Sequence, residues 1–199
     1  MAQDTLIRPA IFLSAGVPDD PGRGAYIDTA DPIAIRDAVR ALAAVVLKSG
    51  RVLVFGGQPA ITPLVAQVAD SIGKLDSVVI YQSEWFRGVT PKEVAWFENL
   101  RWTERKKDIP ASLLEMRRRM VTAPDLRYEA AVFIGGMNGV EDEQALFAEL
   151  QPWARQYPVG STGGAALDLW EKMPAIDTGL RHALREDVQY QSLFEEVIG

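Results

Sequence analysis

The stretch Ala130-Ala-Val-Phe-Ile-Gly-Gly-Met-Asn-Gly-Val-Glu-Asp-Glu143 combines a buried strand, a glycine turn and the start of a helix, in that order. Its apolar run, 130–134, is too short for a helix and too continuous for a half-exposed strand, which predicts a central parallel strand. Gly135, Gly136 and Gly139 allow positive φ and a close approach of the backbone to a ligand. The three acidic residues that end the stretch fall in the first helical turn, where the helix dipole favours carboxylates. The turn is therefore a candidate anion site, although any αβ protein needs glycines at such turns.

Composition limits the class of protein. The chain has 199 residues, 48% hydrophobic and 24% charged, which predicts one soluble globular domain over 1–199, with a core at about 10–172 and a helical tail at 177–199. It has no cysteine and one histidine, so disulfides and a metal site are not expected, and the cytoplasm is the expected location. No run reaches the roughly 18 apolar residues of a membrane span, and no secretory signal is visible. A net charge of -6 disfavours nucleic acid and favours small-molecule or protein partners.

Small or polar residues end each further buried strand. The strand 10–16 ends in Ser-Ala-Gly, the strand 51–57 in a second Gly-Gly, and the strand 77–83 in Gln-Ser. A last strand begins at about 156 and leads into a third glycine turn, where Ser161 and Thr162 are expected to cap a helix over 165–172. The candidate ligand-binding residues are Ser14, Ala15, Gly16, Gly56, Gly57, Gln58, Pro59, Gln82, Ser83, Gly135, Gly136, Met137, Gly139, Val140, Ser161, Thr162, Gly163 and Gly164.

Amphipathic helices alternate with these strands. Asp31-Pro32 predicts a cap and first position of a helix that Gly50 ends, and a second helix is expected from Gln58 to about Ile72. The N–H groups of the Gln58 turn are expected to be free for a ligand. Further helices are expected over 110–121, after Val140, and in the tail, where His182 lies among charges and is expected to be exposed. The segment 17–30 is expected to be a long loop that could cover a site.

The segment 84–108 is the least regular part of the chain. Five large aromatic residues lie among its charges, a helix is expected from Thr90-Pro91 to about Asn99, and a short strand over 100–104. The rings could stack on a nucleobase, line a pocket or form a homodimer interface. Ordinary core packing is the commoner explanation for such a cluster.

Alternating buried strands and helices predict an α/β fold: a single three-layer αβα, Rossmann-like domain with a mostly parallel sheet of five to seven strands. Ligands of such sheets bind at the carboxyl ends of the strands, where the four small-residue turns would converge. The G-x-G-x-x-G fingerprint is absent after the first strand, so a nicotinamide cofactor is not expected and no other cofactor is implied.

The order of these turns resembles the SLOG superfamily, the Rossmann-like group that includes the Smf proteins and the LOG phosphoribohydrolases. The LOG motif Pro-Gly-Gly-x-Gly-Thr-x-x-Glu is similar to 134–143 with one residue added, and the LOG Met-x-x-Arg-Lys helix is similar to 116–120. The resemblance implies that Arg119 stands for the catalytic arginine and Glu143 for the catalytic glutamate. Ile134, Val140 and Met120 depart from the motifs, which favours a non-enzymatic branch whose SLOG domains sense nucleotide-derived signals in bacterial conflict systems.

Three functions remain open on the sequence. The first is a module that binds a nucleotide, an ADP-ribose-like molecule or a cyclic nucleotide signal through oriented N–H groups and an arginine. The second is an N-glycoside hydrolase of nucleoside monophosphates, in which Glu143 would direct water or stabilise the ribose cation. The third is an adaptor without a ligand, which leaves the glycine turns unexplained. Binding by a homodimer is the leading hypothesis.

Overall fold

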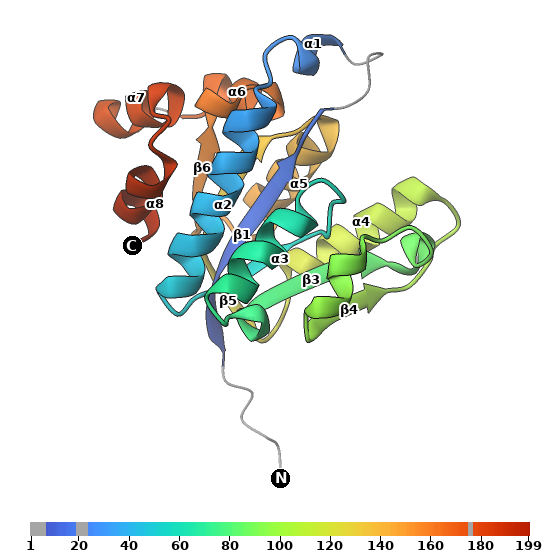
Figure 1. Ribbon diagram of the computed structural model, residues 1–199. Helices are drawn as coiled ribbons and strands as arrows, with labels where there is room; N and C mark the ends of the chain where they lie inside the picture. The colour runs from blue at the N-terminus through green and yellow to red at the C-terminus, as the bar shows by residue number, and fades with distance from the viewer. Residues whose placement is uncertain (1–6, 19–23, 175–176) are drawn as a thin grey trace.

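The computed structural model describes residues 7–18, 24–174 and 177–199. Its centre is a six-stranded sheet in the order β4-β3-β2-β1-β5-β6, and every pair of neighbouring strands is parallel (Figure 1). The strands are β1 (Arg8–Gly16), β2 (Val52–Phe55), β3 (Val78–Ser83), β4 (Asn99–Thr103), β5 (Leu126–Gly135) and β6 (Arg155–Val159). The expectation of a mostly parallel sheet of five to seven strands is confirmed.

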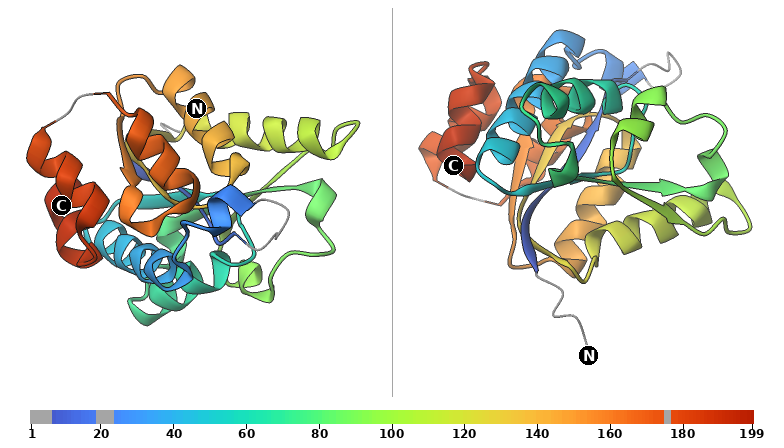
Figure 2. Two further views of the ribbon diagram at one scale, coloured as in Figure 1. Left: turned by 90° about the horizontal axis from the view of Figure 1, so that it is seen from above. Right: turned by 60° about the horizontal axis from the view of Figure 1, so that its bottom comes forward.

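Helices cover both faces of the sheet, which gives the expected three layers (Figures 1 and 2). One face is covered by α2 (Pro32–Lys48), α3 (Thr62–Ser71), α7 (Thr178–Glu186) and α8 (Tyr190–Ile198). The other face is covered by α4 (Ile109–Val121), α5 (Asn138–Leu150) and α6 (Gly164–Lys172). No helix in the described ranges is both long and apolar enough to cross a membrane.

Strand β1 shows how the sequence builds the two cores. Its side chains alternate, so that Ile11 and Leu13 join the core under α2 and α3, while Ala10 and Phe12 join the core under α4 and α5. The ring of Phe12 stacks on that of Phe147 with centroids 5.1 Å apart. Both faces of the strand are buried, which explains its continuous apolar sequence.

The segment between β3 and β4 differs from the expected helix. It contains two short 3₁₀ turns, η3 (Glu84–Phe86) and η4 (Lys92–Trp96), and the chain is extended at Phe97. A helix to Asn99 is therefore wrong, because Asn99 already pairs with Val79 in the sheet. The expected strand at 100–104 is confirmed, one residue earlier.

The tail agrees with the expectation, whereas the segment 17–30 contains a helical turn where a loop was expected. The tail forms two helices, of which α8 packs alongside α2, and His182 is exposed. In the expected loop at 17–30, one short helical turn forms, α1 (Gly24–Ile27), and residues 19–23 lie outside the described ranges.

Candidate functional site

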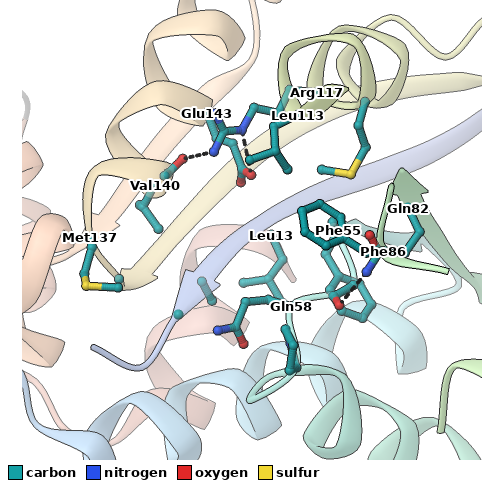
Figure 3. A pocket seen from close by; sticks show the side chains of 18 of the residues that line it. Leu13, Phe55, Gln58, Gln82, Phe86, Leu113, Arg117, Met137, Val140 and Glu143 are labelled. Atoms are coloured by element: carbon teal, nitrogen blue, oxygen red, sulfur yellow. Dashed lines mark hydrogen bonds and ion pairs between the residues drawn. The ribbon is translucent and has the colours of Figure 1, made fainter. Parts of the chain in front are cut away.

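A pocket of about 370 Å³ opens at the carboxyl ends of β1, β2 and β5, on the side where α4 and the segment 86–90 form its walls (Figure 3). Its size lies within the range of about 300–1,000 Å³ that is usual for small-molecule sites. The lining residues are Leu13, Ala15, Gly16, Val17, Phe55, Gly56, Gly57, Gln58, Pro59, Gln82, Phe86, Val89, Thr90, Leu113, Met116, Arg117, Gly136, Met137, Gly139, Val140 and Glu143.

The pocket lies beside the point where the strand order of the sheet reverses. Strands β2, β3 and β4 follow β1 in one direction, whereas β5 lies on the other side of β1. At this point the backbone N–H of Gly136 donates to the carbonyl of Gly16 over 2.7 Å. Parallel αβ sheets bind their ligands in the crevice at such a switch point.

The start of α5 offers unoccupied backbone donors to this pocket. Helices α2 and α4 begin with side-chain caps from Asp31 and Asp108, but no side chain caps α5. Within the described part of the chain, the N–H groups from Met137 to Gly139 have no acceptor. Uncapped N–H groups and the positive end of the dipole make a helix start suitable for an anion.

The start of α3 does not offer such donors, contrary to the expectation for the Gln58 turn. The side-chain oxygen of Gln58 accepts from the N–H groups of Ala60 at 2.6 Å and Ile61 at 3.0 Å, and the Gln58 carbonyl accepts from Thr62. Pro59 and Pro63 have no N–H. The turn therefore satisfies its own donors, and its side chains contact the pocket instead.

Glu143 reaches the pocket from α5 despite the additional residue in its turn. One carboxylate oxygen accepts from the Ser14 hydroxyl at 2.6 Å, and the other lies 3.4 Å from Nε of Arg117. Burial raises the pKa of the Glu143 carboxyl, because desolvation outweighs the opposing effects of Arg117 and Ser14. A carboxyl with a raised pKa in a cleft is a candidate for acid or base chemistry.

Arg117, rather than Arg119, is the arginine at this site. Its side chain is 13% exposed and also donates to Asp142 at 3.0 Å and to the carbonyl of Gly139. Arg119 is 70% exposed and pairs with Glu115, outside the pocket. The expected position of Arg119 is corrected because two residues advance the helix by about 200°, so Arg119 and Arg117 face opposite ways.

The turn that follows β6 does not line the pocket, which corrects the expected convergence of four turns. The Thr162 hydroxyl accepts from the N–H of Gly135 and donates to the Val159 carbonyl, so it does not cap α6. Gly163 and Gly164 pack against Thr29 and Gly136. Ser161 lies near the hydroxyl of Tyr190. Residues 161–164 therefore pack against the Gly135–Gly136 turn outside the pocket, and their polar groups bond to other parts of the protein.

Three other expected site residues are buried beneath the lining. Ser14 contacts Glu143 rather than the pocket, Gly135 is bound to Thr162, and the Ser83 hydroxyl accepts from the N–H of Trp85. Gln82 lines the pocket, but its amide nitrogen donates to the carbonyl of Gly57 at 3.0 Å. The remaining expected positions are among the lining residues given above.

Sequence reasoning did not identify the apolar wall of the pocket. Phe86 and Val89 come from the irregular segment, and Leu113 and Met116 come from α4. Leu113, Met116 and Arg117 have the helical spacing i, i+3, i+4, which was a signal for one shared face. Of the five aromatic residues in the segment 84–108, only Phe86 lines the pocket.

A parallel sheet in this order, with glycine turns and a pocket at its switch point, defines a Rossmann-like αβα protein. The chain belongs to the SLOG cluster3 family, whose model matches residues 25–198. The expected membership of the SLOG superfamily is thereby confirmed.

Among solved structures, the fold is similar to the X-ray structure of TM1055, a target of the Northeast Structural Genomics Consortium. The two share 15% sequence identity with a TM-score of 0.61, and the match covers 96% of this chain and 99% of the other. This likeness concerns the fold alone. No curated protein matches the sequence significantly.

Proposed function

We propose that this SLOG protein binds a nucleotide-derived ligand in the pocket at the switch point. The observation that supports the proposal is the uncapped start of α5, where Met137 and Gly139 line the pocket and their N–H groups have no acceptor among the described residues. Such donors bind a phosphate without a positively charged side chain. They therefore offer an anion site on a protein with a net charge of -6.

The opposite end of the pocket suits a flat apolar group. Figure 3 shows Met137 and Val140 on one side of the pocket and Phe55, Phe86 and Gln82 on the other. We place the phosphate at the α5 start and the base beside the rings. Among the described residues, Arg117 donates three of its five N–H groups, and we assign the other two to the ligand.

The second candidate function is hydrolysis of an N-glycosidic bond, and the position of Glu143 favours it. The carboxyl lines the pocket and has a raised pKa, so it could accept a proton from water or stabilise a ribose cation. We place binding first because both oxygens of Glu143 already have partners, Ser14 and Arg117. A catalytic role requires one of these contacts to open.

A thermal-shift screen with AMP, ADP-ribose, its cyclic isomers and NAD tests the proposal. A ligand at a hundredfold excess over its Kd stabilises the protein by about 2.7 kcal/mol, which is a measurable shift. Arg119→Gln is the control, because Arg119 lies outside the pocket. Absence of a shift with every compound would refute ligand binding of this class.

Chromatography of the incubated hit separates the two functions. Recovery of intact compound, with binding that survives Glu143→Gln, supports a sensor of a nucleotide signal of the kind implied for conflict systems. Release of free base or ribose phosphate, lost in Glu143→Gln, supports the hydrolase.

We also propose that the protein forms a homodimer through the segment between β3 and β4. Val89 and Trp96 of this segment are 72% and 44% exposed, and they offer apolar surface that a second copy of the chain would bury. Light scattering tests the assembly. A monomer at micromolar concentration would contradict it.

A further inference from the structure

The side-chain amide of Gln58 has a defined orientation in the pocket. Its oxygen accepts from two backbone N–H groups, those of Ala60 and Ile61. The amide cannot be turned over, because its NH₂ group would then face two donors and accept from neither. The protein thus holds the oxygen against the turn and directs the nitrogen away from it.

The nitrogen of this amide lies at the crevice. It is 4.0 Å from the position that a Cβ on Gly16 would occupy, and both residues line the pocket. Across the described ranges, Nε2 of Gln58 has no hydrogen-bond partner, whereas Oε1 has two. Gln58 therefore presents two N–H donors to the pocket and no free acceptor.

The nearby Gln82 is different. Its nitrogen donates to the carbonyl of Gly57, and its oxygen accepts from the N–H of Ser83. Both ends of that amide are used to hold the chain, and Gln82 is 6% exposed. Of these two glutamines, only Gln58 has both amide N–H donors without a partner among the described residues.

We propose that Gln58 is a specificity-determining residue that donates to an acceptor atom of the ligand, a phosphoryl, carbonyl or hydroxyl oxygen or a ring nitrogen. The proposal rests on ligand binding at this pocket. Because the same side chain stabilises the turn before α3 through its oxygen, its two roles can be separated by substitution.

The variants Gln58→Glu and Gln58→Met separate donation to the ligand from stabilisation of the turn before α3, because only the first keeps the acceptor for the turn. The glutamate keeps acceptors for Ala60 and Ile61 and adds a charge that the helix start favours, so its Tm should equal or exceed that of the wild type. The methionine removes those acceptors without a change of charge, so its Tm should fall. Both variants lack the two donors.

The measurement is the Kd, by calorimetry, of whichever compound in the nucleotide set stabilises the wild type. We expect Kd to rise about ten- to a hundredfold in both variants, as for loss of a hydrogen bond to a charged or strongly polar group. Gln67→Glu is the matched control: Gln67 is exposed on α3, outside the pocket, and its substitution should leave Kd unchanged.

Each other outcome overturns the inference. Wild-type Kd in both variants means that Gln58 does not contact the ligand, while binding itself stands. Weaker binding in Gln58→Glu alone means that only charge repulsion acts. A wild type that binds no compound of the set refutes the proposed function and this inference with it.

Discussion

Substitution of Gly136 by alanine tests whether the turn at the switch point requires the absence of a side chain. Gly136 has φ +79°, and an added Cβ would lie 2.2 Å from Cγ2 and 3.1 Å from Cβ of Val140. Val140 is 5% exposed and belongs to the core under α5, so its side chain has little room to move. The glycine therefore meets two separate requirements, one of conformation and one of space.

The two costs can be estimated separately. Left-handed backbone costs a residue with a Cβ about 1–2 kcal/mol, and overpacking of a close core contact costs about 1–3 kcal/mol. We therefore expect Gly136→Ala to lower the free energy of unfolding by about 2–5 kcal/mol. Gly50 has the same φ of +79°, and a Cβ added there would meet no other described residue within 4 Å beyond its chain neighbours, so Gly50→Ala should lose the conformational part alone.

Urea unfolding of both variants and the wild type provides the assay. The free energies of unfolding of the two variants should differ by about 1–3 kcal/mol. In a thermal melt, this difference corresponds to about 2–12 °C in Tm for a chain of this size. Equal losses would show that the Val140 side chain moves away at no cost in free energy and that position 136 does not need to lack a side chain for reasons of space. Gly136→Ala should also weaken binding of any hit of the nucleotide screen, because the turn lines the pocket.

Three further predictions concern charged groups. Arg117→Gln should lower the free energy of unfolding by about 1–3 kcal/mol, because it leaves the buried Glu143 without its cation. Arg119→Gln should change the free energy of unfolding by less than about 0.5 kcal/mol. Urea titrations compare the two variants, and similar losses would contradict the assignment of Arg117 to the site. The folded-state pKa of Glu143 lies above its ordinary value of 4.5. The wild type therefore loses stability as the pH rises from the ordinary pKa to the folded-state pKa. Glu143→Gln lacks this loss, and its stability relative to the wild type should increase between pH 4 and pH 7.5; a constant difference would disprove the raised pKa. The pKa of the Asp125 carboxyl is lowered by its bonds to Arg101, so its contribution is present at neutral pH and is lost as pH falls through the folded-state pKa. Asp125→Asn should lower the free energy of unfolding by about 1–2 kcal/mol at pH 7, as for loss of hydrogen bonds to a charged group after allowance for partial exposure. This cost should shrink in acid, and an equal cost at pH 3 would contradict the lowered pKa.

The sequence by itself determined the sheet and the ends of its strands. Apolar runs such as 130–134 are long enough for a strand buried on both faces and too short for a helix, and the glycines after them mark the turns. Parallel strands separated by helices bring their carboxyl ends to one edge, so the site could be placed there in advance. This information is local, because it depends on residue type and on periods of two and 3.6 residues.

The tertiary structure alone decided which groups face the pocket. Arg117 and Arg119 are the two ends of an all-arginine triplet, and only the rotation of α4 against the sheet selects Arg117. The turn at 161–164 has the composition of a phosphate site, yet its polar groups are hydrogen-bonded to Thr29, Asp31 and Gly135. Gln58 likewise uses its oxygen for the turn before α3, while the start of α5 remains uncapped. At 161–164, whether a polar group is free depends on hydrogen bonds between residues far apart in the chain, which no local pattern of residues records.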